Sequence, residues 1–172
     1  GSLTTLYQAY GSKKGLVRAI MERCIGGFAQ TMDALHDSPL PPEQALPIAA
    51  EGMLEEILSP RHIVTHRIVV AEGVSFPDLR DWYFEHGVAP PNLRMADYFA
   101  RQMQAGRLHL DSPRVVANRF HMMVFGDAII RSTAGVLDTG DLAWIKADTR
   151  EAVAIFVRGM QPGGARAGAD TG

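Results

Sequence analysis

Apolar residues recur every three or four positions along nearly the whole chain, and this spacing constrains its fold more than any other feature. Such spacing places apolar side chains on one face of a helix. The first series follows Ser12, a residue type that often caps a helix N-terminus, and consists of Leu16, Ile20, Cys24, Phe28, Met32 and Leu35. It predicts a long amphipathic helix from about Lys13 to His36. Because no segment alternates apolar and polar residues between hairpin turns, we expect an all-α fold.

Proline and glycine mark the boundaries of the other predicted helices. These are expected at residues 42–58, 61–74, 76–84, 92–104, 113–135 and 142–160, with an interruption at 87–91. Gly26 and Gly27 should bend the first helix, and Pro47 should kink the helix at 42–58 or delay its start. The helix at 61–74 is almost continuously apolar, so we expect it to be buried on most sides at the centre of the body. Residues 162–172 have no apolar pattern and are expected to be disordered.

The composition is that of a globular protein. Of its 172 residues, 47% are hydrophobic and 21% are charged, so the chain can bury a core without disulfide staples. The single cysteine, Cys24, excludes a disulfide framework. The sequence has no apolar run of the roughly 18 to 20 residues that cross a membrane, and no secretory signal pattern at its start. We therefore expect a cytoplasmic protein that makes no membrane contact.

The first 25 residues are basic, although the whole chain has a net charge of −2. They contain four basic residues and one acidic residue, whereas the remainder contains 13 basic and 18 acidic residues. Residues 2–16 are expected to form a short helix, a glycine turn and a helix capped by Ser12. Lys13 falls in the first turn of that second helix, where its charge opposes the helix dipole unless a bound anion compensates. This segment therefore favours contact with a phosphate-bearing partner.

The same segment contains a recognisable pattern, Ser-x-x-Thr-Leu-Tyr-x-x-(Phe/Tyr)-x-(Ser/Asn)-Lys-x-x-Leu. The eight matching residues are Ser2, Thr5, Leu6, Tyr7, Tyr10, Ser12, Lys13 and Leu16. The pattern resembles the end of the helix-turn-helix in TetR-family transcriptional regulators. Residues 70–73, 76–79 and 105–108 also resemble parts of the ligand-binding and dimerisation domain of that family, so the resemblance extends over nearly the whole chain.

The resemblance implies a ligand-responsive DNA-binding regulator, a repressor that a small hydrophobic effector releases from its operator. Residues 1–15 would be the C-terminal part of the DNA-binding domain, residues 16–161 the regulatory and dimerisation domain, and residues 162–172 a tail. The implied DNA-contacting residues are Ser2, Leu3, Thr4, Thr5, Tyr7, Gln8, Tyr10 and Lys13. Among them Gln8 is the candidate for reading a base, because its amide can pair with adenine in the major groove.

The family has two further helices before this motif, and they build the core of its DNA-binding head. They have no counterpart before Gly1 in the sequence. Without them the recognition helix lacks its packing partners. We therefore expect the 172-residue chain alone to bind DNA weakly or not at all.

An effector site is expected between the body helices, where methionine and aromatic side chains supply adaptable apolar surface. The candidate lining residues are Phe28, Met32, Met53, His66, Trp82, Tyr98, Met103, His121, Met122 and Phe125. They favour an apolar or aromatic effector, and no cofactor is expected. Arg67 and Glu72 are charged residues on the most apolar helix. They form a structural ion pair or cap, or they orient the ligand. An effector would displace the helix Lys13–His36 and so change the separation of the two recognition helices.

The last two predicted helices have apolar residues on more than one face. A regulator that binds two half-sites is a symmetric dimer, so we expect a homodimer formed through residues 113–160. A second hypothesis is an enzyme or carrier that binds a metal or a small molecule through His62, His66 and Glu72, since imidazoles one helical turn apart can hold a metal ion. The sequence contains no nucleophile elbow and no phosphate-binding glycine loop, and we therefore favour the regulator, which is not an enzyme.

Overall fold

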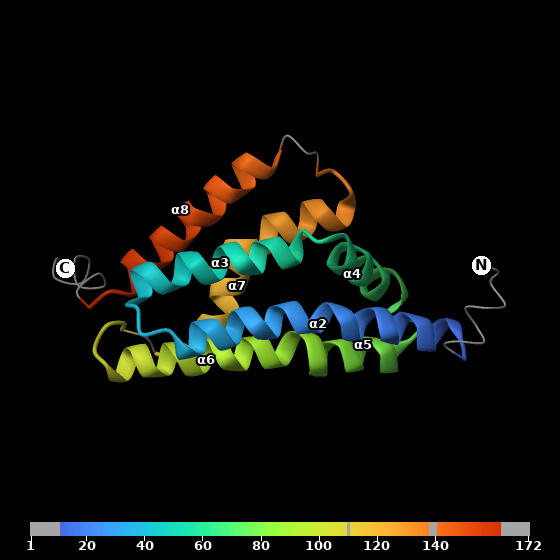
Figure 1. Cartoon of the computed structure of the whole chain (residues 1–172), viewed down its shortest axis with the longest axis horizontal. Coiled ribbons are helices and arrows are strands. Elements are labelled where there is room, and N and C mark those ends of the chain that lie inside the picture. The colour runs from blue at the N-terminus through green and yellow to red at the C-terminus, as the bar shows by residue number, and fades with distance from the viewer. Residues whose placement is uncertain (1–10, 110, 138–140, 163–172) are drawn as a thin grey trace, which may run out of the picture.

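The computed structural model describes residues 11–109, 111–137 and 141–162, and every regular element in them is a helix (Figure 1). The elements are α2 (Lys13–Asp37), α3 (Pro42–Ile57), α4 (Pro60–Glu72), α5 (Pro77–Tyr83), the π-helical turn η1 (Phe84–Val88), α6 (Ala89–Gln104), α7 (Pro113–Ala134) and α8 (Leu142–Met160). The predicted all-α fold is confirmed. Within the described residues, no helix combines the length and the apolar character needed to cross a membrane.

Serine and glycine set several helix ends in the predicted way. Ser12 Oγ accepts a hydrogen bond of 3.0 Å from the backbone N–H of Gly15 at the start of α2. Ser59 Oγ accepts one of 3.2 Å from the N–H of His62 at the start of α4. Gly135 adopts a φ of 77° immediately after α7, the left-handed conformation that ends many helices. Local sequence therefore determines where these helices begin and end.

Neither of the two predicted distortions interrupts its helix. α2 continues through Gly26 and Gly27, and α3 continues through Pro47. α2 packs against α3 and α6, and such tertiary contacts offset the weak helix propensity of glycine. Pro47 leaves the carbonyl of Glu43 without its helical donor, but Glu43 is exposed in the first turn of α3, where water can supply the missing bond.

The predicted interruption at 87–91 is instead a π-helical turn that joins α5 to α6. The N–H of Ala89 bonds to the carbonyl of Phe84, five residues earlier. Pro90 and Pro91 follow at the start of α6, where the absence of their N–H groups is tolerated. The prediction of a break was wrong. One wider, π-helical turn lets the chain pass from α5 directly into a new helix that begins with a proline pair.

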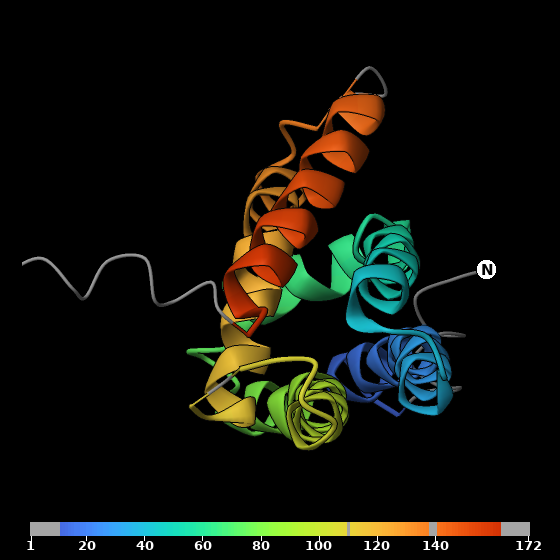
Figure 2. The ribbon, with the colours of Figure 1, turned by 90° about the vertical axis from the view of Figure 1, so that its left-hand side faces the viewer.

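The helices pack around one main core. α2 packs against α3 and α6, α8 packs against α3 and α7, and α7 also packs against α6. Viewed along the long axis, α8 and part of α7 project together away from the layer of α2 and α6 (Figure 2). The ring of Phe120 on α7 lies 4.9 Å from that of Phe156 on α8 and 5.9 Å from that of Phe99 on α6. These aromatic contacts connect the three helices.

α4 is less buried than its apolar sequence predicts. Thr65 and Val69 are its buried residues, whereas Val64 and Val70 are exposed. The prediction of a helix buried on most sides was wrong because a continuous apolar run does not specify which face packs. Val69 instead joins Met21, Leu79 and Tyr83 in a second, smaller cluster of buried residues, which we call the satellite cluster. This cluster connects the N-terminal half of α2 to α4 and α5.

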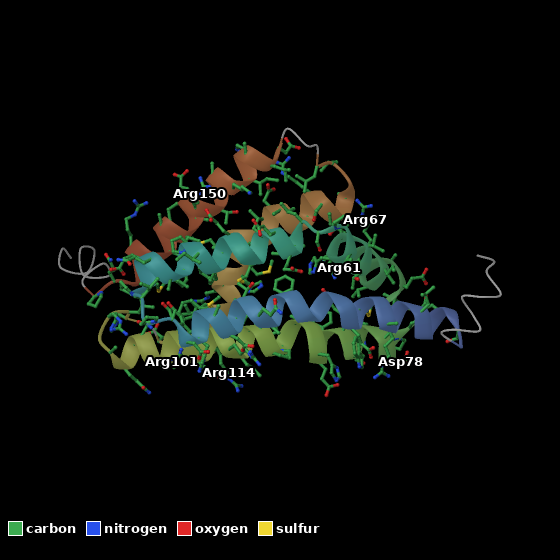
Figure 3. All side chains as sticks on the ribbon, in the orientation of Figure 1. Arg61, Arg67, Asp78, Arg101, Arg114 and Arg150 are labelled. Atoms are coloured by element: carbon green, nitrogen blue, oxygen red, sulfur yellow. The ribbon has the colours of Figure 1, made fainter. Side chains whose placement is uncertain are left out.

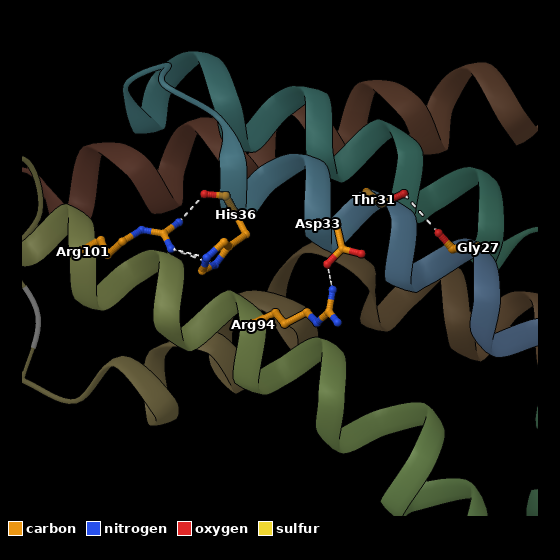
Figure 4. A network of polar contacts seen from close by, with 6 residues as sticks. All are labelled: Gly27, Thr31, Asp33, His36, Arg94 and Arg101. Atoms are coloured by element: carbon orange, nitrogen blue, oxygen red, sulfur yellow. Dashed lines mark hydrogen bonds and ion pairs between the residues drawn. The ribbon is translucent and has the colours of Figure 1, made fainter.

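Polar contacts fasten α2 to α6 on the surface (Figure 4). Arg94 pairs with Asp33, and Arg101 contacts both the ring and the carbonyl oxygen of His36. On the opposite side of the bundle, Arg150 of α8 pairs with Glu51 of α3 at 2.9 Å. Because these side chains are largely exposed, each pair contributes about 1 kcal/mol at most. The buried core, rather than these pairs, holds the helices together.

Candidate functional site

Three histidines and two phenylalanines lie between α2, α4 and α7. The rings of His62 and His66, one turn apart on α4, have centroids 6.2 Å apart and nearly parallel planes. Phe28 of α2 lies against His62 at 5.2 Å. On α7, His121 contacts Phe125 at 5.3 Å, and Phe125 and Phe28 belong to the same buried core. We call these five residues the histidine cluster.

The imidazoles of the histidine cluster are uncharged at neutral pH. Burial lowers the pKa of His62 to about 4, with further lowering contributions from His66 and His121. Burial also lowers the pKa of His121 to about 4 and lowers that of His66. A neutral imidazole has one N–H donor and one bare nitrogen acceptor. The cluster therefore offers hydrogen-bonding atoms without a net charge.

The chain itself uses only part of this hydrogen-bonding capacity. His66 Nδ1 and Thr133 Oγ1 of α7 are hydrogen-bonded at 2.8 Å. In contrast, His121 Nδ1 is buried and has no hydrogen-bond partner among the described residues. Leaving a buried polar atom without a partner costs about 1–3 kcal/mol, and most such atoms in native proteins are satisfied. His121 therefore marks a place where a polar atom of a ligand would be stabilised.

Arg67 connects α4 to the C-terminal end of α7, where Figure 3 shows it. Its Nε and Nη2 each donate a hydrogen bond of 2.8 Å, to the carbonyl oxygens of Thr133 and Ser132 respectively. Both carbonyls lie in the last turn of α7, where a helix supplies few backbone donors, and that of Ser132 also accepts from the N–H of Gly135 at 3.3 Å. Arg67 thus has the structural capping role that was one of its two predicted roles. Since His66 bonds to the same turn, α4 and the end of α7 are joined at two points.

The structure brings some of the predicted lining residues together and separates others. Phe28, Met32, Met53, Tyr98 and Phe125 are buried in the main core. Burial raises the pKa of Tyr98 to about 12, while Arg107 and Arg101, at the C-terminal end of α6, act in the opposite direction. The hydroxyl group of Tyr98 is buried and has no hydrogen-bond partner among the described residues.

Trp82, Met103 and Met122 do not lie with the histidine cluster. Trp82 packs against the satellite cluster, with the guanidinium group of Arg18 5.1 Å from its ring centroid and the ring of His86 stacked on it at 4.7 Å. Met103 is 36% exposed and Met122 is 61% exposed. In the single chain these two methionines are therefore surface residues, so a role in binding an effector stays a prediction for them.

The predicted DNA-contacting residues Ser2, Leu3, Thr4, Thr5, Tyr7, Gln8 and Tyr10 lie outside the described residues. Lys13 is the first residue of α2, and its side chain also lies outside the described part. Just beyond it, Arg18 of α2 pairs with Glu22 at 3.1 Å and packs on Trp82. The segment that follows the predicted head is therefore attached to α5.

Sequence reasoning missed a groove beside η1. The groove has a volume of about 620 Å³ and is lined by Phe84, Glu85, Val88, Ala89, Asn92, Leu93 and Arg114. Asn92 Oδ1 is buried there without a hydrogen-bond partner among the described residues. The proline pair that produces the π-helical turn could have indicated an irregular surface here, but nothing in the sequence places Arg114 of α7 opposite this turn. The groove does not include the histidine cluster.

α7 and α8 expose large apolar side chains. These side chains, which we call the α7–α8 surface, are Val115, Met122, Met123, Ile130, Leu142, Trp144 and Ile155. The guanidinium group of Arg131 lies 5.2 Å from the ring centroid of Trp144 and so links the two helices. Extensive exposed apolar surface on a protein commonly marks an interaction site.

Comparison with known proteins identifies the family. Residues 44–160, more than half of the chain, match the model of the C-terminal domain of AefR-like transcriptional repressors, a TetR-family domain. The chain therefore belongs to the TetR family of transcriptional regulators. Members of this family bind operator DNA and small-molecule effectors as dimers and are not enzymes.

Family membership confirms the predicted regulator and does not favour the alternative of an enzyme or carrier that uses His62, His66 and Glu72. In the described part of the chain, no group of three or more His, Cys, Asp or Glu side chains could hold a metal ion. The two histidines of that hypothesis instead belong to the histidine cluster, where His66 bonds to Thr133.

Solved structures show the same fold. A TetR-family transcriptional regulator from Mesorhizobium loti has a TM-score of 0.79 at 15% identity, covering 94% of this chain and 82% of that one. The flavonoid-responsive regulator FrrA has a TM-score of 0.66 at 24% identity, covering 94% and 81%. A TetR transcriptional regulator from Agrobacterium tumefaciens has a TM-score of 0.66 at 18% identity, covering 95% and 80%. No curated protein sequence matches the chain significantly.

Proposed function

We propose that this protein is a dimeric cytoplasmic repressor that leaves its operator when a small apolar or aromatic molecule binds at the histidine cluster. The observation that carries the proposal is the cluster itself, in which uncharged imidazoles and phenylalanine rings meet between three helices and His121 Nδ1 has no described partner. Ligand sites in proteins typically combine mainly apolar walls with a few polar atoms. FrrA, described as flavonoid-responsive, shares the fold, which is consistent with an aromatic effector.

In this proposal, residues 1–15 are the end of the DNA-binding domain, residues 16–161 are the regulatory domain and residues 162–172 are a tail. The DNA-contacting residues are Ser2, Leu3, Thr4, Thr5, Tyr7, Gln8, Tyr10 and Lys13. Leu3, Thr4 and Gln8 face the bases, with Gln8 the best candidate for reading one, and Thr5, Tyr7, Tyr10 and Lys13 hold phosphates. Membership of a DNA-binding family supports this assignment. α2 begins within this segment and is therefore the connection between the head and the body.

The effector acts through α4. This helix contributes His62 and His66 to the histidine cluster, is bonded to α7 through Arg67 and contributes Val69 to the satellite cluster beside Met21 of α2. A molecule inserted against His62 and Phe28 changes the position of α4 relative to α2, and the contact with Met21 passes the change toward the head. The protein then has two conformations, one that fits the operator well and one that fits it poorly. The effector releases DNA only if it binds the second conformation more tightly than the first.

Release of an operator tests the proposed function. The operator is first selected from a pool of random DNA with the protein as its gene encodes it. Adding the effector should then lower the affinity of the protein for this operator by about tenfold or more, within the usual range of allosteric coupling. The measurement is fluorescence anisotropy of labelled DNA at constant salt, because protein–DNA affinity depends on salt. Unchanged operator affinity across a broad panel of apolar and aromatic compounds would contradict the proposal.

The homodimer is proposed to form through residues 113–160, and Ile130→Asp should therefore dissociate it. Ile130 is 66% exposed in the single chain, so aspartate there costs the isolated protomer little, whereas an unpaired carboxylate buried in an interface is strongly unfavourable. We expect the dimer dissociation constant to rise by roughly 100-fold or more, measured by sedimentation velocity over a range of concentrations. The matched control is Val74→Asp, because Val74 is 88% exposed beyond α4. An intact dimer with Ile130→Asp would place the interface elsewhere.

A further inference from the structure

We infer that the histidine cluster takes an uncharged phenol, an aromatic compound whose hydroxyl group hydrogen-bonds to Nδ1 of His121. This inference rests on the proposed function and deepens it, because it names the chemical class of the effector. It follows from three properties of the cluster, namely its rings, its unpartnered nitrogen and the surrounding charges.

The aromatic part of the inference follows from the ring contacts. Phe28 and His62 are tilted by 52° at 5.2 Å, and His121 and Phe125 are tilted by 64° at 5.3 Å. Rings that meet edge to face or offset at such distances attract one another. A flat aromatic ligand between α2, α4 and α7 extends this pattern of contacts, whereas an aliphatic chain gains only from burial. The cluster thus favours an aromatic ligand.

The unpartnered Nδ1 of His121 indicates that the ligand has a hydroxyl group. His66 is already bonded to Thr133 at 2.8 Å, but His121 Nδ1 is buried with no described partner. In a neutral imidazole either nitrogen can hold the hydrogen atom. A hydroxyl group both donates and accepts, so it satisfies Nδ1 in either tautomer, whereas an ether oxygen only accepts. The hydroxyl group is therefore the smallest ligand group that fits this nitrogen in both states.

The absence of ligand charge follows from the positions of the neighbouring arginines, which Figure 3 labels. Arg67 donates to the carbonyl oxygens of Ser132 and Thr133, and Arg61 lies 3.9 Å from the carboxylate of Glu56. The imidazoles themselves are neutral because burial lowers their pKa values. Both arginines of α4 therefore already have partners, and a buried carboxylate, whose desolvation is costly without an opposite charge, gains none from this helix.

Three naphthalene compounds with different substituents test the inference on the dimeric protein at pH 7. They are 2-naphthol, 2-methoxynaphthalene and 2-naphthoate, and a monohydroxyflavone with its methyl ether forms a larger pair. Isothermal titration calorimetry should show that the hydroxyl compounds bind about tenfold more tightly than their ethers, as expected for one additional hydrogen bond. 2-Naphthoate should bind at least about tenfold more weakly than 2-naphthol, because its charge lacks a partner.

Variants at His121 assign the effect to the nitrogen. With His121→Phe, the tenfold preference for the hydroxyl group should fall to about onefold. With His121→Asn, whose amide places a polar atom near the position of Nδ1, part of the preference should remain. The matched control is His109→Phe, since His109 is exposed, and it should keep the full preference. Circular dichroism melting of each variant confirms that the compared proteins are folded.

Several outcomes would overturn the inference. They are a hydroxyl preference that survives His121→Phe in full, equal affinity for hydroxyl and ether, tighter binding of 2-naphthoate than of 2-naphthol, and no binding of any compound to the folded dimer. Failure of the proposed function looks different in the same samples. A phenol that binds through His121 but leaves operator affinity unchanged supports the ligand assignment and contradicts the regulatory role of the site.

Discussion

Replacing Phe120 with alanine is expected to lower the free energy of unfolding by about 3–5 kcal/mol, the usual cost of removing a large buried aromatic side chain. Phe120 of α7 is fully buried and contacts Phe99, Phe125 and Phe156 at ring-centroid distances of 4.9 to 6.2 Å. The truncation removes apolar burial and edge-to-face ring contacts together. It leaves a cavity where α6, α7 and α8 meet, next to the histidine cluster on α7.

Urea unfolding at a fixed protein concentration measures this loss, because the stability of a dimer depends on concentration. The matched control is Phe84→Ala, since Phe84 is 53% exposed at the surface groove, and its truncation should change the unfolding free energy by less than about 1 kcal/mol. If Phe120→Ala lowered the free energy of unfolding as little as Phe84→Ala does, the three helices would be held together by something other than the aromatic contacts of Phe120.

The elements that sequence predicted well are those with local signals at both ends. α2 has a capping serine at its start and a regular apolar stripe, and α7 begins with Ser112-Pro113 and ends at Gly135. Each of these signals acts within a few residues. Ser12 Oγ accepts from the N–H of Gly15, whereas Ser112 makes no such bond and Pro113 suits the first turn of α7 without one. Helix bounds could therefore be read from the chain without knowledge of the packing.

The elements predicted poorly depend on their neighbours. The apolar run of α4 was assigned to the centre of the body, yet Val64 and Val70 are exposed. Its burial is decided by α2 and α7, which contact other positions of the helix. The π-helical turn escaped prediction for a related reason, since Pro90 and Pro91 show where a regular helix cannot continue but not what replaces it.

In the candidate site too, local features could be predicted from the sequence and contacts between distant residues could not. The spacing of His62 and His66 places both imidazoles on one face of a helix, which sequence alone established. Their contacts with Phe28 of α2 and Thr133 of α7 join residues that are far apart in the chain. Met122 follows His121 directly, so the two side chains project about 100° apart around α7. The sequence named both as lining residues, but the helix directs them to different surroundings.

The histidine cluster should also make the fold sensitive to acid, with a loss on the order of 4 kcal/mol in unfolding free energy between pH 7 and pH 5. His62 and His121 have an ordinary pKa of 6.5 that burial lowers to about 4 in the folded protein. Between these values the unfolded chain binds protons that the folded chain does not, so stability falls as the pH decreases through 6.5 and stops falling near 4. At pH 5 each imidazole accounts for on the order of 2 kcal/mol.

Urea unfolding at pH 7, 6 and 5 measures this dependence. Aspartate and glutamate side chains titrate mainly below this range in unfolded chains, so they contribute little to the change. His121→Phe removes one of the two imidazoles whose pKa is lowered to about 4, and it should reduce the acid-induced loss by somewhat less than half, because His66, whose pKa burial also lowers, adds to the part that remains. His109→Phe, at an exposed position, should leave the loss unchanged. A loss of the same size in His121→Phe would mean that groups outside the cluster take up the protons, and that His121 is not held neutral in the folded protein. Since a protonated imidazole has no bare nitrogen, that result would also weaken the case for a phenol hydroxyl donating to Nδ1.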